Sequence, residues 1–280
     1  MFPPILDFAG ARVIVKDALP IGAATVLSQY SFFIGTILLG YMASGAELGW
    51  YTAAHRLVTF IWAYGLVTSS RVLLPQLSKS FGASSSEFAD LVMSVLRVIT
   101  AGSLLFGIVA VAGGSDIIHL IYGNQYQQSA LVLQILSISL VVGTTRSVLE
   151  TGLIASKRPQ LYMKGMIGLS VLYTIVTYVG ILYSGIVGAA VASLIVEVVY
   201  AVYLMRVFEV LSFRRIAAIC WKPYAAAIAV SLLLVMTETR SLPLVVLGGG
   251  LCYVALLFAS GQIRGNDFRI FRNVFGATIG

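Results

Sequence analysis

The sequence predicts an all-α integral membrane protein with about eight transmembrane helices. Of its 280 residues, 59% are hydrophobic and only 10% are charged, whereas a soluble domain carries about 25% charged residues. Apolar runs of roughly 20 residues, the length that crosses a hydrocarbon core of about 30 Å, recur along the chain. The runs are continuously apolar and do not alternate every second residue, so helices are expected and a β-barrel is not.

Eight apolar segments are expected to cross the membrane. Pro75 is expected to close the second of them, because proline cannot continue a helix without losing a hydrogen bond. The polar stretch GASSSEF is expected to be the loop that follows. The expected spans are residues 18–42, 50–74, 89–112, 128–153, 162–184, 186–207, 217–237 and 242–261.

Lysine and arginine are distributed unevenly between the two sides of these spans. The first, third, fifth and seventh loops hold only Arg240, whereas the other side holds thirteen basic residues: Arg12, Lys16, Lys79, Lys157, Arg158, Lys164, Arg206, Arg214, Arg215, Lys222, Arg264, Arg269 and Arg272. By the positive-inside rule both termini are expected to be cytoplasmic. The net charge of +7 is therefore read as a topology signal, and no nucleic-acid partner is expected.

Four arginines fall within spans: Arg56, Arg71, Arg97 and Arg146. A charge near mid-bilayer costs at least about 2.5–3.5 kcal/mol, so it normally faces a partner, a water-filled cavity or a ligand. Arg71 lies within a turn of the cytoplasmic end and can extend its head group to the interface. Arg97 is about two turns in and allows either a functional or an interfacial reading. Arg56 lies about two turns in from the external end of the second span, and Arg146 lies near the middle of the fourth.

Two carboxylates accompany these arginines in the membrane. Glu150 follows Arg146 by four residues in TTRSVLETG, so the two lie on one helix face and can form a local ion pair. Glu197 lies near the centre of the sixth span. It suits a proton-coupling site, and equally a partner for an arginine on another helix. Arg146 is therefore either a cavity-lining ligand with a counter-ion or a member of a structural pair.

No pattern of catalytic chemistry is present in the sequence. It has no nucleophile elbow, no metal-ligand cluster and no phosphate loop. Cys220 and Cys252 lack metal-ligand spacing and are expected to be packing residues. We therefore expect neither an enzyme nor a protein with a metal or cofactor. Cationic groups in a glycine-rich helical bundle are more typical of a pathway for an anionic solute.

Four stretches resemble the bacterial lipid-linked oligosaccharide flippases, the O-antigen and exopolysaccharide group of the multidrug and oligosaccharidyl-lipid exporter superfamily. Each pattern is short, but their order and spacing over residues 16–207 match the second lobe of that family. The stretches are KDALPIGAATVLSQYSFFIGTILLG at 16–40, ELGWYTAAHRLVTF at 47–60, LLPQLSKSF at 73–81 and IIHLIYGNQYQQSALVLQIL at 117–136.

The resemblance implies the second lobe of a two-lobe transporter. Residues 18–207 would form its six helices and residues 208–262 two additional transmembrane helices. They would be flanked by a cytoplasmic segment at 1–17 and a cytoplasmic basic tail at 263–280. Because no first lobe is present, the chain is expected to be a piece of a longer protein or to need a partner. That partner would be a first-lobe polypeptide or polysaccharide assembly proteins. The chain would lie in the bacterial cytoplasmic (inner) membrane, in contact with membrane lipid.

The implied substrate is a polyprenyl-diphosphate-linked oligosaccharide, which is transferred between leaflets. Burial arguments, and no family motif, assign Arg146 and Arg56 first and Arg97 second to diphosphate binding, because arginine can donate two hydrogen bonds to one phosphate. Glu150 and Glu197 are assigned as pairing or ion-coupling carboxylates. Two alternatives stay open, namely a multidrug or cation exporter of the same superfamily and a non-transporting membrane scaffold for polysaccharide assembly.

Overall fold

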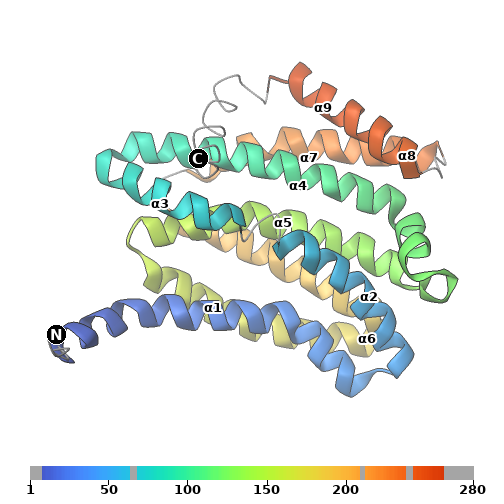
Figure 1. Cartoon of the computed structure of the whole chain (residues 1–280), viewed down its shortest axis with the longest axis horizontal. Helices are drawn as coiled ribbons and strands as arrows, with labels where there is room; N and C mark the ends of the chain where they lie inside the picture. Colours follow the sequence, from blue (N-terminus) through green and yellow to red (C-terminus); the bar gives the residue numbers. More distant parts are fainter. Residues whose placement is uncertain (1–7, 64–67, 209–211, 238–241, 262–280) are drawn as a thin grey trace, which may run out of the picture.

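The computed structural model describes residues 8–63, 68–208, 212–237 and 242–261, and they form an all-α, multi-pass membrane protein (Figure 1). Among these residues, six helices are long and apolar enough to cross a membrane. The elements are α1 (Phe8–Met42), α2 (Gly45–Trp62), α3 (Thr68–Ala83), α4 (Ser85–Tyr122), η2 (Asn124–Tyr126), α5 (Ser129–Ala155), α6 (Pro159–Val207), α7 (Phe213–Met236), α8 (Leu242–Leu244), η3 (Val245–Gly249) and α9 (Gly250–Ala259).

Helix α6 contains two of the expected spans joined by a sharp kink. Its 49 residues would extend about 74 Å at 1.5 Å per residue, more than twice the hydrocarbon thickness. Ser184 and Gly185 leave helical geometry, and Gly185 has a φ of 54°, a left-handed conformation that favours glycine. The chain therefore turns back on itself, and the predicted division into 162–184 and 186–207 is confirmed. We call residues 159–183 the first arm and residues 186–207 the second arm.

The expected span at 50–74 is divided between α2 and α3. Helix α2 shares a hydrophobic cluster with the first half of α5, including Leu133 and Leu136. Helix α3 shares another with the second half of α5, including Leu149 and Leu153. The two shorter helices therefore pack one after the other along the length of α5. Helix α2 starts earlier than predicted because Ser44 and Glu47 form a capping box at its N-terminus.

Two predicted breaks between α2 and α4 were wrong. Pro75 lies inside α3, where it removes one backbone hydrogen bond without ending the helix. The predicted loop at 82–88 is reduced to Ser84, whose side chain accepts a hydrogen bond of 3.1 Å from the Glu87 backbone N–H and starts α4. Hydropathy locates the lipid-embedded part of a helix, and these helices continue into polar sequence.

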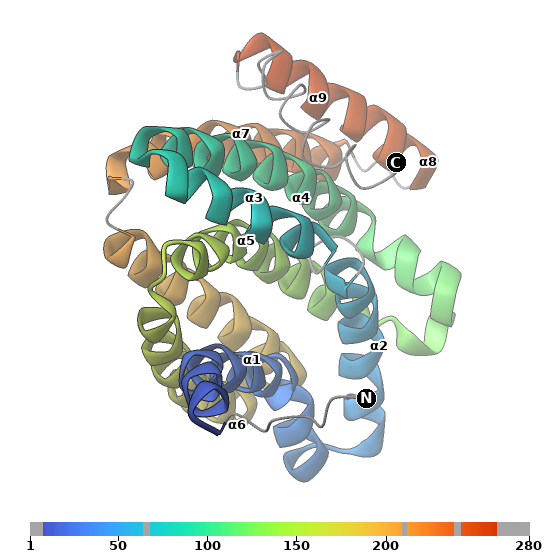
Figure 2. The same cartoon turned by 60° about the vertical axis from the view of Figure 1, so that its left-hand side comes forward.

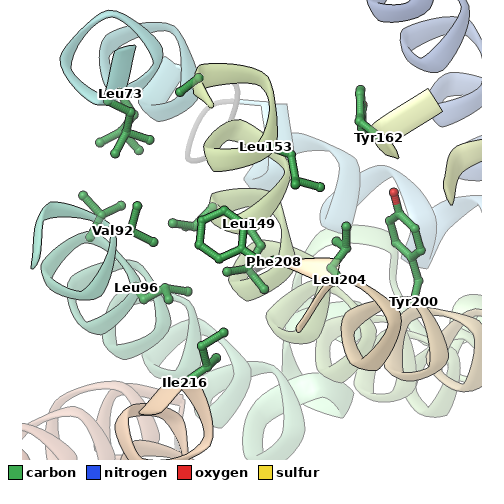
Figure 3. Close-up of a cluster of buried hydrophobic side chains, with 14 of the residues drawn as sticks. Leu73, Val92, Leu96, Leu149, Leu153, Tyr162, Tyr200, Leu204, Phe208 and Ile216 are labelled. Atoms are coloured by element: carbon green, nitrogen blue, oxygen red, sulfur yellow. The ribbon is translucent and has the colours of Figure 1, made fainter. Parts of the chain in front are cut away.

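Helix α5 is the centre of the bundle. It packs against α2, α3, α4 and α6, while α1 packs along α6. Figure 2 shows α4 and α7 on one side of α5, with α9 outermost. Figure 3 shows the cluster that joins α3, α4 and α7 to α5 and the second arm of α6, where Leu149 and the aromatic ring of Phe208 are almost completely buried. Gly152 leaves the space that this ring occupies.

The two arms of α6 touch through glycines near the kink. A methyl group at Gly188 would overlap the backbone carbonyl oxygen of Gly180, which no side-chain movement can relieve. We expect Gly188→Ala to lower the free energy of unfolding in detergent by about 1–3 kcal/mol, the usual range for overpacking. Gly168→Ala on the same helix is the matched control, because its added Cβ meets no atom within 4 Å. Equal melting temperatures for the two variants would contradict the close crossing.

Candidate functional site

A polar cavity of about 60 Å³ lies between α1, α2, α5 and α6. This volume has room for a few water molecules. The cavity is unusual for the interior of a membrane protein because hydroxyl, imidazole and charged groups line it together. The polar lining residues are Ser28, Ser31, Tyr51, His55, Ser139, Arg146, Tyr173, Ser193 and Glu197.

Arg146 is held between two carboxylates beside this cavity. Its Nη1 donates to Glu150 Oε1 at 2.5 Å, and its Nη2 donates to Glu197 Oε1 at 3.1 Å. Its Nε also donates to the second oxygen of Glu197. The guanidinium lies 5.1 Å from the ring centroid of Tyr200, within the range of a cation–π contact. We call Arg146, Glu150 and Glu197 the charge triad.

The sequence around the triad allows α5 and the second arm of α6 to approach each other closely. Glu150 reaches Arg146 because four residues are about one helical turn. Gly143 lies one turn before Arg146, and a Cβ there would be 3.3 Å from a carboxylate oxygen of Glu197. Glycine at this position therefore gives the α6 carboxylate room beside α5.

The triad contains both ion pairs that the sequence allowed, one within a helix and one between two helices. Arg146 has the local partner Glu150, and Glu197 is the partner of an arginine on another helix. With all three groups ionised the triad carries a net charge of −1, and three N–H groups of Arg146 are directed at carboxylates. Arg146 and Glu197 nevertheless line the cavity, whereas Glu150 is not one of its lining residues.

The other two predicted arginines are not brought to this cavity. Arg56 is exposed on the outer face of α2, and among the described residues it has no hydrogen-bond or ion-pair partner. It lies about 17 Å along the helix from Gly45, and α2 is not one of the six described helices that are long and apolar enough to cross a membrane. Arg97 is half-buried on α4. The side chain of Arg71 lies outside the described residues.

Sequence reasoning missed the contribution of His55 and several serines to the cavity. His55 is buried, with Nε2 3.1 Å from the Phe32 carbonyl oxygen and Nδ1 3.3 Å from the Thr59 hydroxyl. Serines join neighbouring helices at Ser31–Ser170 and Ser139–Ser193, at 3.0 and 3.2 Å. Clustering of hydroxyls on the faces of α1 and α5 was the available signal. In the described part of the chain, no three His, Cys, Asp or Glu residues are grouped to hold a metal ion.

Comparison with known proteins finds a family match over the first part of the chain. Residues 4–131 match the family described as "Polysaccharide biosynthesis protein". The predicted family resemblance is confirmed. The polysaccharide biosynthesis match covers α1 to α4 and the beginning of α5, so it includes Arg56 and Arg97 and ends before the triad.

The fold is also that of a solved lipid transporter. The lipid II flippase MurJ, in an inward closed conformation, superposes with a TM-score of 0.71 at 15% sequence identity over 92% of this chain. The match includes 57% of the MurJ chain, so this chain spans a little over half the length of that transporter. At this identity the likeness establishes the shared fold.

The triad predicts a specific pattern of stability. Arg146→Met should lower the free energy of unfolding in detergent by about 3–5 kcal/mol, because it leaves two buried carboxylates without a counter-charge. Adding Glu150→Gln and Glu197→Gln to this variant should restore most of the loss. Arg56→Met, the same change at an exposed position, should have little effect. A stable Arg146→Met variant would show that the carboxylates do not depend on Arg146.

Proposed function

We propose that this chain is the second lobe of a flippase that moves a polyprenyl-diphosphate-linked oligosaccharide across the bacterial cytoplasmic membrane. The fold shared with lipid II flippase MurJ and the polysaccharide biosynthesis match support the transporter class and the lipid-linked substrate. The observation that carries the proposal is Arg56, an exposed arginine of α2 without a partner among the described residues. Such a charge is expensive in lipid unless it faces a water-filled pathway or an anion.

Arg56 is the best candidate for the diphosphate ligand. Its planar guanidinium donates two parallel hydrogen bonds to a phosphate, a geometry that lysine cannot reproduce. Arg97, half-buried on α4, is the second candidate. Arg146 is a weaker ligand than the sequence suggested, because its N–H groups are engaged by Glu150 and Glu197.

The triad fits the ion-coupling role proposed for Glu150 and Glu197. A net charge of −1 beside a cavity with room for water attracts a cation or a proton and repels a diphosphate. Binding there would weaken the hold of Glu197 on Arg146 and so alter the contact between α5 and the second arm of α6. Movement of one helix against another is what alternating access requires.

The same negative triad favours one second candidate, a multidrug or cation exporter of the same superfamily. In that case the cavity itself would bind the solute and Arg56 would have no role in transport. The two candidates therefore differ in which residue is essential. Either activity needs both lobes of the transporter. We propose that a separate polypeptide supplies the first lobe and that both termini of this chain lie on the cytoplasmic side.

Replacement of Arg56 distinguishes the two functions. In the complete transporter, Arg56→Ala should reduce export of the lipid-linked polymer at least about ten-fold, the effect of losing a charge-assisted hydrogen bond of 1.5–3 kcal/mol. Arg56→Lys should retain part of the activity because it keeps the charge. Export can be measured in cells as surface polymer, with membrane insertion checked separately.

Lys79→Ala, at an exposed lysine of α3, serves as the matched control and should export normally. Normal polymer export by Arg56→Ala would overturn the proposed diphosphate role. If export of a cationic drug were lost in Glu197→Gln and retained in Arg56→Ala, the cation exporter would replace the flippase as the proposed function.

A further inference from the structure

A groove of about 200 Å³ runs between the two arms of α6, on the side away from the polar cavity. Its floor is apolar and is made by Gly165, Gly168 and Leu172 of the first arm and Val199 of the second. Gly168 and Val199 are exposed, so the groove opens to the surroundings of the helix. A membrane helix surrounded by lipid fills such a depression with a hydrocarbon chain.

Basic residues lie at one end of the groove. Lys164 lines it and is exposed; it lies about 8 Å along the helix from Pro159, a depth from which a lysine reaches the head-group layer. On the opposite arm, Arg206 is also exposed and follows Tyr203, another lining residue, by about one turn. This end of the groove is therefore suited to a phosphate.

Tyr200 is a buried wall of the groove. Its side chain is 3% exposed, and its hydroxyl is enclosed by protein. The hydroxyl lies 3.2 Å from the position of a Cβ on Gly165, and Figure 3 shows it directed toward the first arm, which carries Tyr162. Tyr200 therefore closes the bottom of the groove and contributes no free hydrogen-bond donor to it.

We propose that this groove binds one acyl chain of an anionic phospholipid. Lys164 holds the phosphate. The acyl chain lies along the apolar floor over Gly168. The order of charge and then apolar surface along the groove matches the order of phosphate and hydrocarbon in a phospholipid.

The walls of the groove favour a resident phospholipid over the transported substrate. Leu169 and Tyr200 are almost completely buried and separate the groove from the cavity that contains Glu197. Arg56 lies on another helix and does not line the groove. A molecule bound here therefore has no direct route to the triad or to Arg56, and the inference stands independently of the proposed transport function.

The bound lipid also supports the charge triad. It rests against Tyr200, whose ring packs beside the Arg146 guanidinium. The same ring stacks on Tyr203 at 5.8 Å between centroids. Occupancy of the groove by lipid therefore holds both tyrosines in place and stabilises the contact between α5 and the second arm.

The test is lipid retention by the full chain. The protein is reconstituted in phosphatidylcholine vesicles with or without phosphatidylglycerol, extracted in detergent and weighed by native mass spectrometry. The wild type should retain phosphatidylglycerol in preference to phosphatidylcholine. Gly168→Leu places a side chain in the groove, and its Cβ meets no atom within 4 Å; this variant should lose phosphatidylglycerol. Lys164→Gln should retain about ten-fold less, as expected for a lost charge-assisted contact.

Gly102→Leu is the matched control, because an added Cβ at Gly102 of α4 also meets no atom within 4 Å; it should retain lipid as the wild type does. If Gly168→Leu loses helical circular dichroism, Lys164→Gln carries the test through the rise in melting temperature on adding phosphatidylglycerol. The proposal is overturned by equal retention in Gly168→Leu, by no preference for the anionic lipid, or by no effect of Lys164→Gln. Displacement of the lipid by farnesyl diphosphate would also overturn it, in favour of a substrate-tail site.

Discussion

The ionic contact of Arg146 with Glu150 and Glu197 is the constraint around which the bundle is built. Each of these charges would be costly in the hydrocarbon core alone. Together they satisfy one another across α5 and the second arm of α6, provided that the helices keep their register. Gly143 provides the space, and Tyr200 covers the guanidinium. The triad therefore fixes where α5 lies relative to α6, and the other helices pack around that pair.

The opposite side of α5 carries a second polar link, this one without charge. Thr145 lies beside Arg146 in sequence, and its hydroxyl is 3.2 Å from both Thr100 of α4 and Tyr224 of α7. Consecutive residues of α5 thus contact α6 on one side and α4 and α7 on the other. A displacement of α5 would therefore disturb its contacts with α4 and α7 through these hydroxyls.

Much of this fold follows from composition and spacing, and the site follows only in part. Apolar run length located the long spans but not the division of residues 50–74 between α2 and α3, and the Arg146–Glu150 spacing predicted their contact. The hydrogen bond from Arg146 to Glu197 joins residues 51 apart in sequence. The sequence offered Glu197 as a proton-coupling carboxylate or as the partner of an arginine on another helix, and only the packing of α6 on α5 reveals this pairing. His55 and Arg56 are adjacent, yet one is buried in the cavity and the other is exposed. Hydropathy gives the depth of a residue but does not give the direction in which its helix face points.

Arg146 is paired and organises the bundle, whereas Arg56 is exposed and is the arginine that we propose meets the substrate. Charge restoration at Arg56 tests this separation most directly. In the complete transporter with Cys220 and Cys252 changed to serine, Arg56→Cys would be modified with a cationic aminoethyl thiosulfonate or with its anionic sulfonatoethyl counterpart, and polymer export would be measured. We expect the cationic reagent to restore export and the anionic reagent to leave it impaired. Equal export after both treatments, or full export by unmodified Arg56→Cys, would contradict it.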